Sequence, residues 1–207
     1  WASGDTTYSR GNITNNNIDV SFNDGTSTPR GVVHDLGTGF IDDTEWILRW
    51  KLNFSVLTGD ISWFMGMTTA DQDTLTGANQ DSIGMFYVKN TNKLYGADSD
   101  GGAVTIEGAT SLTLVTATDY YCEVKRISAT SYISTIYSDS DYSIVLASIT
   151  GTTVATNSNQ RYIAFKNSSV TYTGTSTFTV DDLSFWNGVS SPNAEGRKVV
   201  FTDNAFD

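Results

Sequence analysis

The sequence predicts an all-β fold, a sandwich of two antiparallel β-sheets with jelly-roll architecture. Three observations predict it: apolar and polar residues alternate with a period of two, helical periodicity is nearly absent, and turn residues recur at short spacing. Ser, Thr, Asn and Gly are abundant and only 17% of residues are charged, which suits many strands joined by polar turns. The length of 207 residues fits one large β domain.

The clearest strand covers Trp46–Phe54. Every second residue along it is large and apolar, namely Trp46, Leu48, Trp50, Leu52 and Phe54. Successive side chains of a strand point to opposite sides, so the intervening residues Ile47, Arg49, Lys51 and Asn53 are predicted on the other face. We therefore expect one face of this strand to lie in a core.

Further strands are predicted before and after this one, each a short run rich in β-branched, aromatic or alternating residues. In chain order they are Ile18–Asn23, Gly31–Leu36, Ile61–Thr68, Ser82–Lys89, Lys93–Ala97, Leu112–Val115, Tyr120–Ser128, Ser131–Ser138, Ile144–Thr150, Gln160–Asn167 and Phe178–Trp186. Clusters of Asn, Asp, Ser and Gly separate them and predict turns, for example at residues 23–25, 98–102 and 138–141.

The sandwich is predicted to occupy residues 1–188. Residues 189–207 are predicted to form a linker, which contains Pro192 and Gly196, and a C-terminal strand-like tail that begins at Lys198. This last strand has two alternatives. It belongs to its own sheet as an ordinary final strand, or it starts a following module or docks on a neighbouring copy.

Composition excludes several classes of partner. The formal net charge of −11 disfavours nucleic acid, because phosphate binding needs clustered Lys and Arg. No apolar run reaches 18 residues, so no membrane insertion is predicted. The single cysteine, Cys122, cannot form a disulfide within the chain.

Five stretches together resemble one family. They are His34-Asp35-Leu36-Gly37, Trp46–Phe54, Asn79–Gly84, Tyr120–Arg126 and Val180–Gly188. These stretches resemble the concanavalin A-like lectin and glucanase (laminin-G-like) jelly-roll domains of archaeal, viral and environmental surface proteins. The resemblance covers residues 1–188 and implies an extracellular location, on a cell or virion surface. It also implies a short opening strand of the Phe-Ser-Asp-Asp-Phe type, which Phe201–Phe206 approximates at the opposite end of the chain.

No catalytic motif is present, so the chain is not expected to be an enzyme. Glycosidases need a close pair of carboxylates, and no Glu-x-Asp-x-Glu pattern occurs. The only histidine, His34, lies in an apolar-flanked strand and is expected to have a structural or exposed role rather than to act as a base.

Alternation places a candidate glycan-binding row on the outward face of three strands. In Tyr120–Ser128, Tyr120, Cys122 and Val124 form the core face, which leaves Tyr121 and Glu123 outward, and in Ser131–Ser138 the outward residues include Tyr137. If these strands adjoin Trp46–Phe54, one face carries the candidate ligand-binding residues Tyr121, Tyr137, Arg49, Lys51 and Glu123. Sugars stack on aromatic rings and take hydrogen bonds from polar groups, so this face is a candidate site. The alternative is an ordinary solvated sheet face with a cross-strand Lys–Glu pair.

Asp181 and Asp182 are the candidate metal ligands. The resemblance implies a structural calcium ion held by an Asp of the last main strand, and both residues match that position. Two adjacent carboxylates beside an apolar strand repel each other, which fits either a Ca²⁺ ion or a β-bulge.

The leading functional hypothesis is a non-catalytic carbohydrate-binding, lectin-like module of an extracellular surface protein. The alternative is a structural subunit that binds neighbouring copies of itself, by strand or tail exchange, in a filament, a surface layer or a virion. Strand addition at an open sheet edge satisfies unpaired backbone groups and makes that alternative physically accessible.

Overall fold

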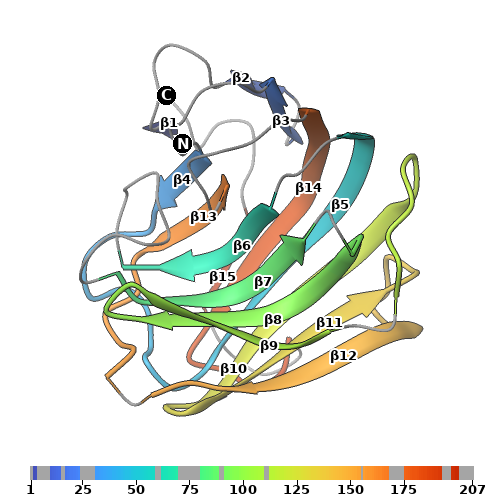
Figure 1. The fold of residues 1–207 in the computed structure, drawn as a ribbon. Coiled ribbons are helices and arrows are strands. Elements are labelled where there is room, and N and C mark those ends of the chain that lie inside the picture. Colours follow the sequence, from blue (N-terminus) through green and yellow to red (C-terminus); the bar gives the residue numbers. More distant parts are fainter. Residues whose placement is uncertain are drawn as a thin grey trace.

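The computed structural model describes residues 2–3, 10–14, 17–23, 31–58, 62–69, 80–88, 91–109, 112–154, 156–167, 175–192 and 197–200. These residues form two sheets whose strand pairings are all antiparallel (Figure 1). The prediction of an all-β, two-sheet sandwich is therefore confirmed.

The first sheet has seven strands. Their spatial order is β1 (Ala2–Ser3), β4 (Gly31–Asp35), β13 (Tyr162–Asn167), β6 (Ser62–Thr68), β7 (Ser82–Val88), β8 (Lys93–Asp100) and β9 (Ala103–Ala109). The strands from β6 to β9 form a meander, since each pairs with the next along the chain.

The second sheet has eight strands. Seven follow the order β12 (Val145–Thr152), β11 (Ser131–Tyr137), β10 (Asp119–Ser128), β5 (Trp46–Thr58), β14 (Thr175–Asn187), β3 (Asn17–Asn23) and β2 (Arg10–Thr14), and β15 (Arg197–Val200) also pairs with β14. The two 13-residue strands β5 and β14 lie side by side at the centre of this sheet.

The main core lies between the sheets, as the alternation predicts. All five apolar residues of the predicted Trp46–Phe54 face are fully buried, and so are Cys122, Val124 and Tyr132 of the neighbouring strands. Aromatic contacts join the layers: Trp50 meets Phe165 edge-on at 6.0 Å, and Phe178 meets Trp63 at 5.0 Å.

A second apolar cluster lies on the opposite face of the first sheet. Phe64 alternates with the core residues Trp63 and Met65 and therefore points away from them. The buried members of this cluster are Val33, Phe64, Phe86, Ala97 and Ala164.

The structure corrects three local predictions. Leu112–Val115 is not a strand, because its amides bond elsewhere: Leu114 N donates to Asn92 O and Val115 N to the Tyr120 hydroxyl. The predicted turn at residues 98–102 is shorter, since β8 continues to Asp100 and only Gly101 and Gly102 make the turn. Both glycines have positive φ, as a two-residue hairpin requires, and the pairing that follows forms β9, a strand the sequence did not predict.

The C-terminal strand lies in its own sheet. Residues 197–200 pair with β14 from Ser184 to Asn187, and Val189 is buried against Ile47 and Trp186. Of the two alternatives for this segment, the structure therefore shows an ordinary final strand in its own sheet. The Phe201–Phe206 motif lies outside the described residues. The described part of the chain contains no helix long and apolar enough to span a membrane.

Candidate functional site

The three strands of the predicted glycan-binding row do adjoin, in the order β11, β10, β5, followed by β14. Two neighbouring rows of cross-strand partners run over these four strands. One aligns Tyr137, Tyr121, Lys51 and Asp181, and the next aligns Thr135, Glu123, Arg49 and Ser184. The predicted residues therefore share one outer face of the second sheet.

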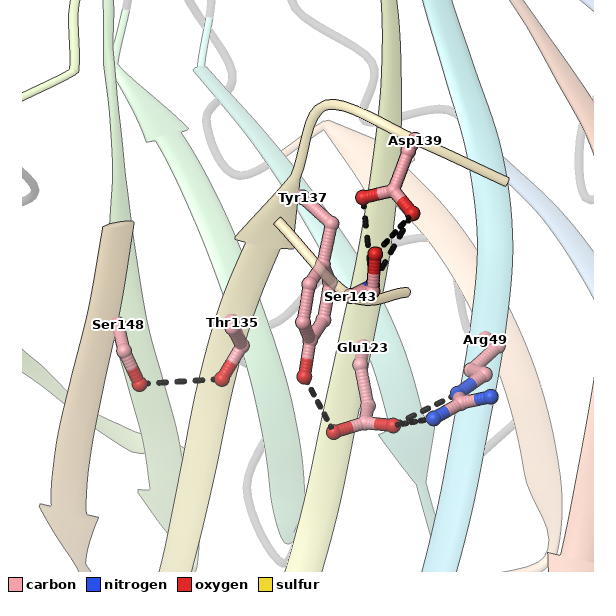
Figure 2. Close-up of polar contacts among 7 residues, drawn as sticks. All are labelled: Arg49, Glu123, Thr135, Tyr137, Asp139, Ser143 and Ser148. Carbon is pink, nitrogen blue, oxygen red and sulfur yellow. Dashed lines mark hydrogen bonds and ion pairs between the residues drawn. The ribbon is translucent and has the colours of Figure 1, made fainter. Parts of the chain in front are cut away.

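Glu123 is the electrostatic centre of this face (Figure 2). Its Oε2 atom lies 2.6 Å from both Nε and Nη2 of Arg49, and its Oε1 atom accepts a bond from the Tyr137 hydroxyl at 3.3 Å. Glu123 is only 7% exposed, and these partners replace the hydrogen bonds to water that its carboxylate loses on folding. Burial, together with the Glu123 charge, raises the pKa of Tyr137.

Tyr142 covers this ion pair from the side of the solvent. The guanidinium carbon of Arg49 lies 4.0 Å from the centre of the Tyr142 ring and 5.6 Å from that of Trp186. The Tyr142 ring also meets Tyr121 edge-on at 5.9 Å and Tyr137 at 5.4 Å. Burial among these neighbours raises the pKa of Tyr142, which stays a neutral phenol.

The loop between β11 and β12 places Tyr142, and Asp139 builds that loop. The Asp139 carboxylate accepts a bond from the Ser143 hydroxyl at 2.8 Å (Figure 2). It also accepts one from the Ile144 amide at 2.7 Å. The loop closes where Ser138 N donates to Ile144 O at 3.0 Å. Tyr142 has a φ of 55°, which orients its ring back over the sheet and is uncommon for a non-glycine residue.

A pocket of about 280 Å³ opens between this loop and β14. On the β14 side it is bordered by a β-bulge, because the register with β5 shifts between Asp181 and Ser184 and Asp182 has a φ of 52°. Eight residues line the pocket, which we call the Tyr142 pocket: Arg49, Tyr121, Ser140, Asp141, Tyr142, Asp182, Ser184 and Trp186. Aromatic rings, hydroxyls and carboxylates thus converge on one hollow.

Lys51 lies at the edge of this arrangement. Its Nζ atom is 2.9 Å from Asp181 Oδ2, and this contact raises the pKa of Lys51. Of the five predicted ligand-binding residues, Arg49 and Tyr121 line the pocket, Glu123 and Tyr137 support Arg49 and Tyr142, and Lys51 pairs with Asp181 instead.

Comparisons with known proteins establish the fold. The sequence matches no protein-family model, and no curated protein matches it. A legume lectin-like domain from Entamoeba histolytica superimposes with a TM-score of 0.54 at 12% identity, over 88% of this chain and 89% of that one. A protein of unknown function from Shewanella oneidensis MR-1 does so with a TM-score of 0.52 at 18% identity, over 89% of this chain and 83% of that one.

The fold is that of the concanavalin A-like lectins and glucanases. The resemblance that the sequence predicted is thereby confirmed at the level of the fold. The identities are too low to carry a function from those proteins to this one. The origin in archaeal, viral or environmental surface proteins stays a prediction.

Two explanations were offered for the adjacent carboxylates of Asp181 and Asp182, a Ca²⁺ ion and a β-bulge, and the structure contains the β-bulge. In this concanavalin A-like sandwich both residues lie at the bulge, and the Lys51 ammonium forms an ion pair with Asp181. A calcium ion needs six to eight oxygen ligands, and the described residues hold no group of three or more His, Cys, Asp or Glu side chains arranged for a metal. The structure thus shows the bulge and a counter-ion for Asp181, and the calcium assignment stays a prediction.

The pocket residues that were not predicted from the sequence include Tyr142, Asp141, Ser184 and Trp186. Tyr142 follows the Ser138–Asp141 turn signal, so period-two alternation assigns it no face. One sequence feature could have predicted this loop: Asp139 follows a β-strand and is followed by Ser143. An Asp at a turn accepts bonds from nearby backbone amides and so fixes a compact loop.

Proposed function

We propose that this chain is a non-catalytic carbohydrate-binding module of an extracellular or particle-surface protein, and that the Tyr142 pocket is its binding site. The observation that carries the proposal is the convergence of the Tyr121, Tyr142 and Trp186 rings with hydroxyl and carboxylate groups in one hollow. The lectin-like fold of the chain supports the same conclusion without specifying a ligand.

The composition of the pocket suits a sugar. The C–H face of a pyranose ring packs on an aromatic ring, while its hydroxyls need donors and acceptors at the margin. Tyr142 and Tyr121 supply half-buried rings, and Ser140, Ser184 and Asp182 supply polar groups at the margin. The Arg49–Glu123 pair beneath them holds the rings in place, so little ordering is left to the moment of binding.

The engagement of Glu123, the carboxylate at the centre of this face, supports the proposal that the module is non-catalytic. Glycoside hydrolysis needs one carboxyl group free to donate a proton and another free to act as base or nucleophile. Both oxygens of Glu123 are occupied by Arg49 and Tyr137. Burial lowers the pKa of His34 to about 4, and this residue lies on β4 of the other sheet.

Replacing Tyr142 with alanine is expected to weaken binding of neutral oligosaccharides at least about tenfold, because both the stacking surface and the cover of Arg49 are lost. Tyr142→Phe keeps the ring and should bind within about threefold of the wild type. A glycan array followed by calorimetry on the tightest neutral ligand measures both variants.

Tyr95→Ala is the matched control, since Tyr95 is a half-buried tyrosine of the first sheet that lies outside the Tyr142 pocket. Equal affinity of the wild type and Tyr142→Ala for every bound glycan would contradict the proposal that glycans bind in this pocket.

A second candidate function, self-assembly, is favoured by one edge of the sandwich. Among the described strands β9 pairs only with β8 and β12 only with β11, so each leaves an edge without a partner strand. These two strands lie side by side at one end of the sandwich (Figure 1) and expose Ile106 at 47% and Val145 at 55%. An unpaired edge with exposed aliphatic residues is a surface on which a second copy can add its own edge strand.

Val145→Lys is expected to shift self-association to higher protein concentration, because a charge on the edge opposes strand addition. Light scattering after size-exclusion chromatography, over a wide concentration range, measures the effect. A wild-type chain that stays monomeric throughout would eliminate this second candidate and leave the first intact.

A further inference from the structure

The cations around the Tyr142 pocket already have carboxylate partners. The Arg49 guanidinium is held by Glu123 at 2.6 Å, and its flat face lies under the Tyr142 ring. The Lys51 ammonium is held by Asp181 at 2.9 Å. An incoming anion would therefore meet cations whose charge a neighbouring carboxylate already offsets.

Two carboxylates at the rim have no such partner. Asp141 comes from the β11–β12 loop, Asp182 comes from the bulge of β14, and both are exposed and line the pocket. Within the described residues neither side chain forms an ion pair. With the two ion pairs cancelling internally, the rim keeps two negative charges on a chain whose net charge is −11.

We infer that the Tyr142 pocket recognises uncharged, hydroxyl-rich glycans and excludes acidic ones, such as uronate-, sialate- or sulfate-bearing sugars. This inference rests on the proposed carbohydrate-binding function. Sugar hydroxyls donate to Asp141 and Asp182, and hydrogen bonds to charged acceptors are the stronger kind. A carboxylate or sulfate on the ligand would face the same two groups and be repelled.

The experiment compares matched ligands on the full chain at low and at high salt. The probes are a neutral oligosaccharide that binds on the array and its uronate counterpart of equal length and linkage. The neutral ligand is expected to bind at least about fivefold more tightly at low ionic strength, where charges act over about 30 Å. Molar salt should reduce that preference by screening the rim charges, while affinity for the neutral ligand changes little.

The double variant Asp141→Asn and Asp182→Asn removes both rim charges and keeps hydrogen-bond acceptors. Asparagine also tolerates the positive φ at position 182, so the bulge is preserved. The variant should lose most of the preference for neutral ligands. Asp100→Asn, at an exposed aspartate of the first sheet outside the pocket, is the control and should keep the preference.

The outcomes separate the two proposals. An acidic ligand that binds as tightly as its neutral counterpart, or more tightly, overturns the inference and leaves carbohydrate binding standing. Unchanged discrimination in the double variant also overturns it, because the selectivity would then come from elsewhere. Binding of neither ligand class overturns the proposed function, and the inference with it.

Discussion

Asp98→Asn is expected to stabilise the folded protein by about 3 kcal/mol at neutral pH and by almost nothing at pH 4. Asp98 is 5% exposed, and its Oδ1 atom is buried without a hydrogen-bond partner. Burial raises the pKa of Asp98 from 3.8 to about 6, and the neighbouring Glu107 and Asp100 carboxylates act in the same direction. An asparagine keeps the shape of the side chain and carries no charge to bury.

The sign of the pH dependence follows from the raised pKa. The folded state binds the Asp98 proton more tightly than the unfolded state, so this group favours folding fully below pH 3.8. That advantage is lost as the pH rises, and above about pH 6 the folded state holds a buried, uncompensated carboxylate. The difference between 3.8 and about 6 corresponds to about 3 kcal/mol.

Urea unfolding of the wild type and the variant between pH 4 and pH 8 measures the difference in the free energy of unfolding. Taking the difference between the two proteins cancels the contribution of every other carboxylate. We expect the difference in the free energy of unfolding between the two proteins to increase from pH 4 to pH 7. A gap that is constant with pH, or a variant less stable than the wild type at pH 7, would contradict the burial of an ionised Asp98.

Gly151→Ala is the second large effect, in the opposite direction, with an expected loss of about 3 kcal/mol of stability. Gly151 is the cross-strand partner of Tyr132, whose ring is fully buried and lies over the glycine. A Cβ atom at position 151 would lie 2.1 Å from Cζ of that ring, far inside van der Waals contact. A fully buried ring can shift little to relieve this clash, because protein cores are close-packed.

A double-mutant cycle tests this cause directly. In a Tyr132→Leu background the ring is gone, so Gly151→Ala should cost less than about 0.5 kcal/mol or even stabilise the strand. Thr150→Ala, at the exposed neighbouring position, is the control and should change the free energy of unfolding by no more than about 0.5 kcal/mol. Equal losses from Gly151→Ala in both backgrounds would show that the Tyr132 ring is not responsible.

The strands were predictable where one face meets the core. The period-two pattern of Trp46–Phe54 assigned its five inter-sheet core side chains correctly, although Ile47 on the other face is buried as well. The same pattern placed Tyr121 and Tyr137 on one outer face with Arg49. Such patterns survive in the sequence because a shift of one residue would move the whole apolar set into water.

The site itself was only partly predictable, because its decisive parts lie where alternation stops. The cover of Arg49 by Tyr142 depends on a loop that Asp139 shapes, and the rim position of Asp182 depends on a bulge in β14. Asp98 was assigned to a turn by its Asp-Ser-Asp-Gly-Gly context, yet the two glycines alone complete the hairpin and leave Asp98 inside. The loop and the hairpin have local signals, whereas the cover of Arg49 and the bulge in β14 depend on contacts between strands that lie far apart in the sequence.

The most direct test of the central claim is a titration of ¹⁵N-labelled protein with the neutral oligosaccharide that binds most tightly on the array, followed by backbone amide shifts. Binding in the Tyr142 pocket predicts that the largest changes fall in residues 138–144 and 181–186, on the two sides of the hollow. Changes centred instead on Phe64, Phe86 and Tyr95, on the opposite face of the first sheet, would contradict it and place the site on the other side of the molecule.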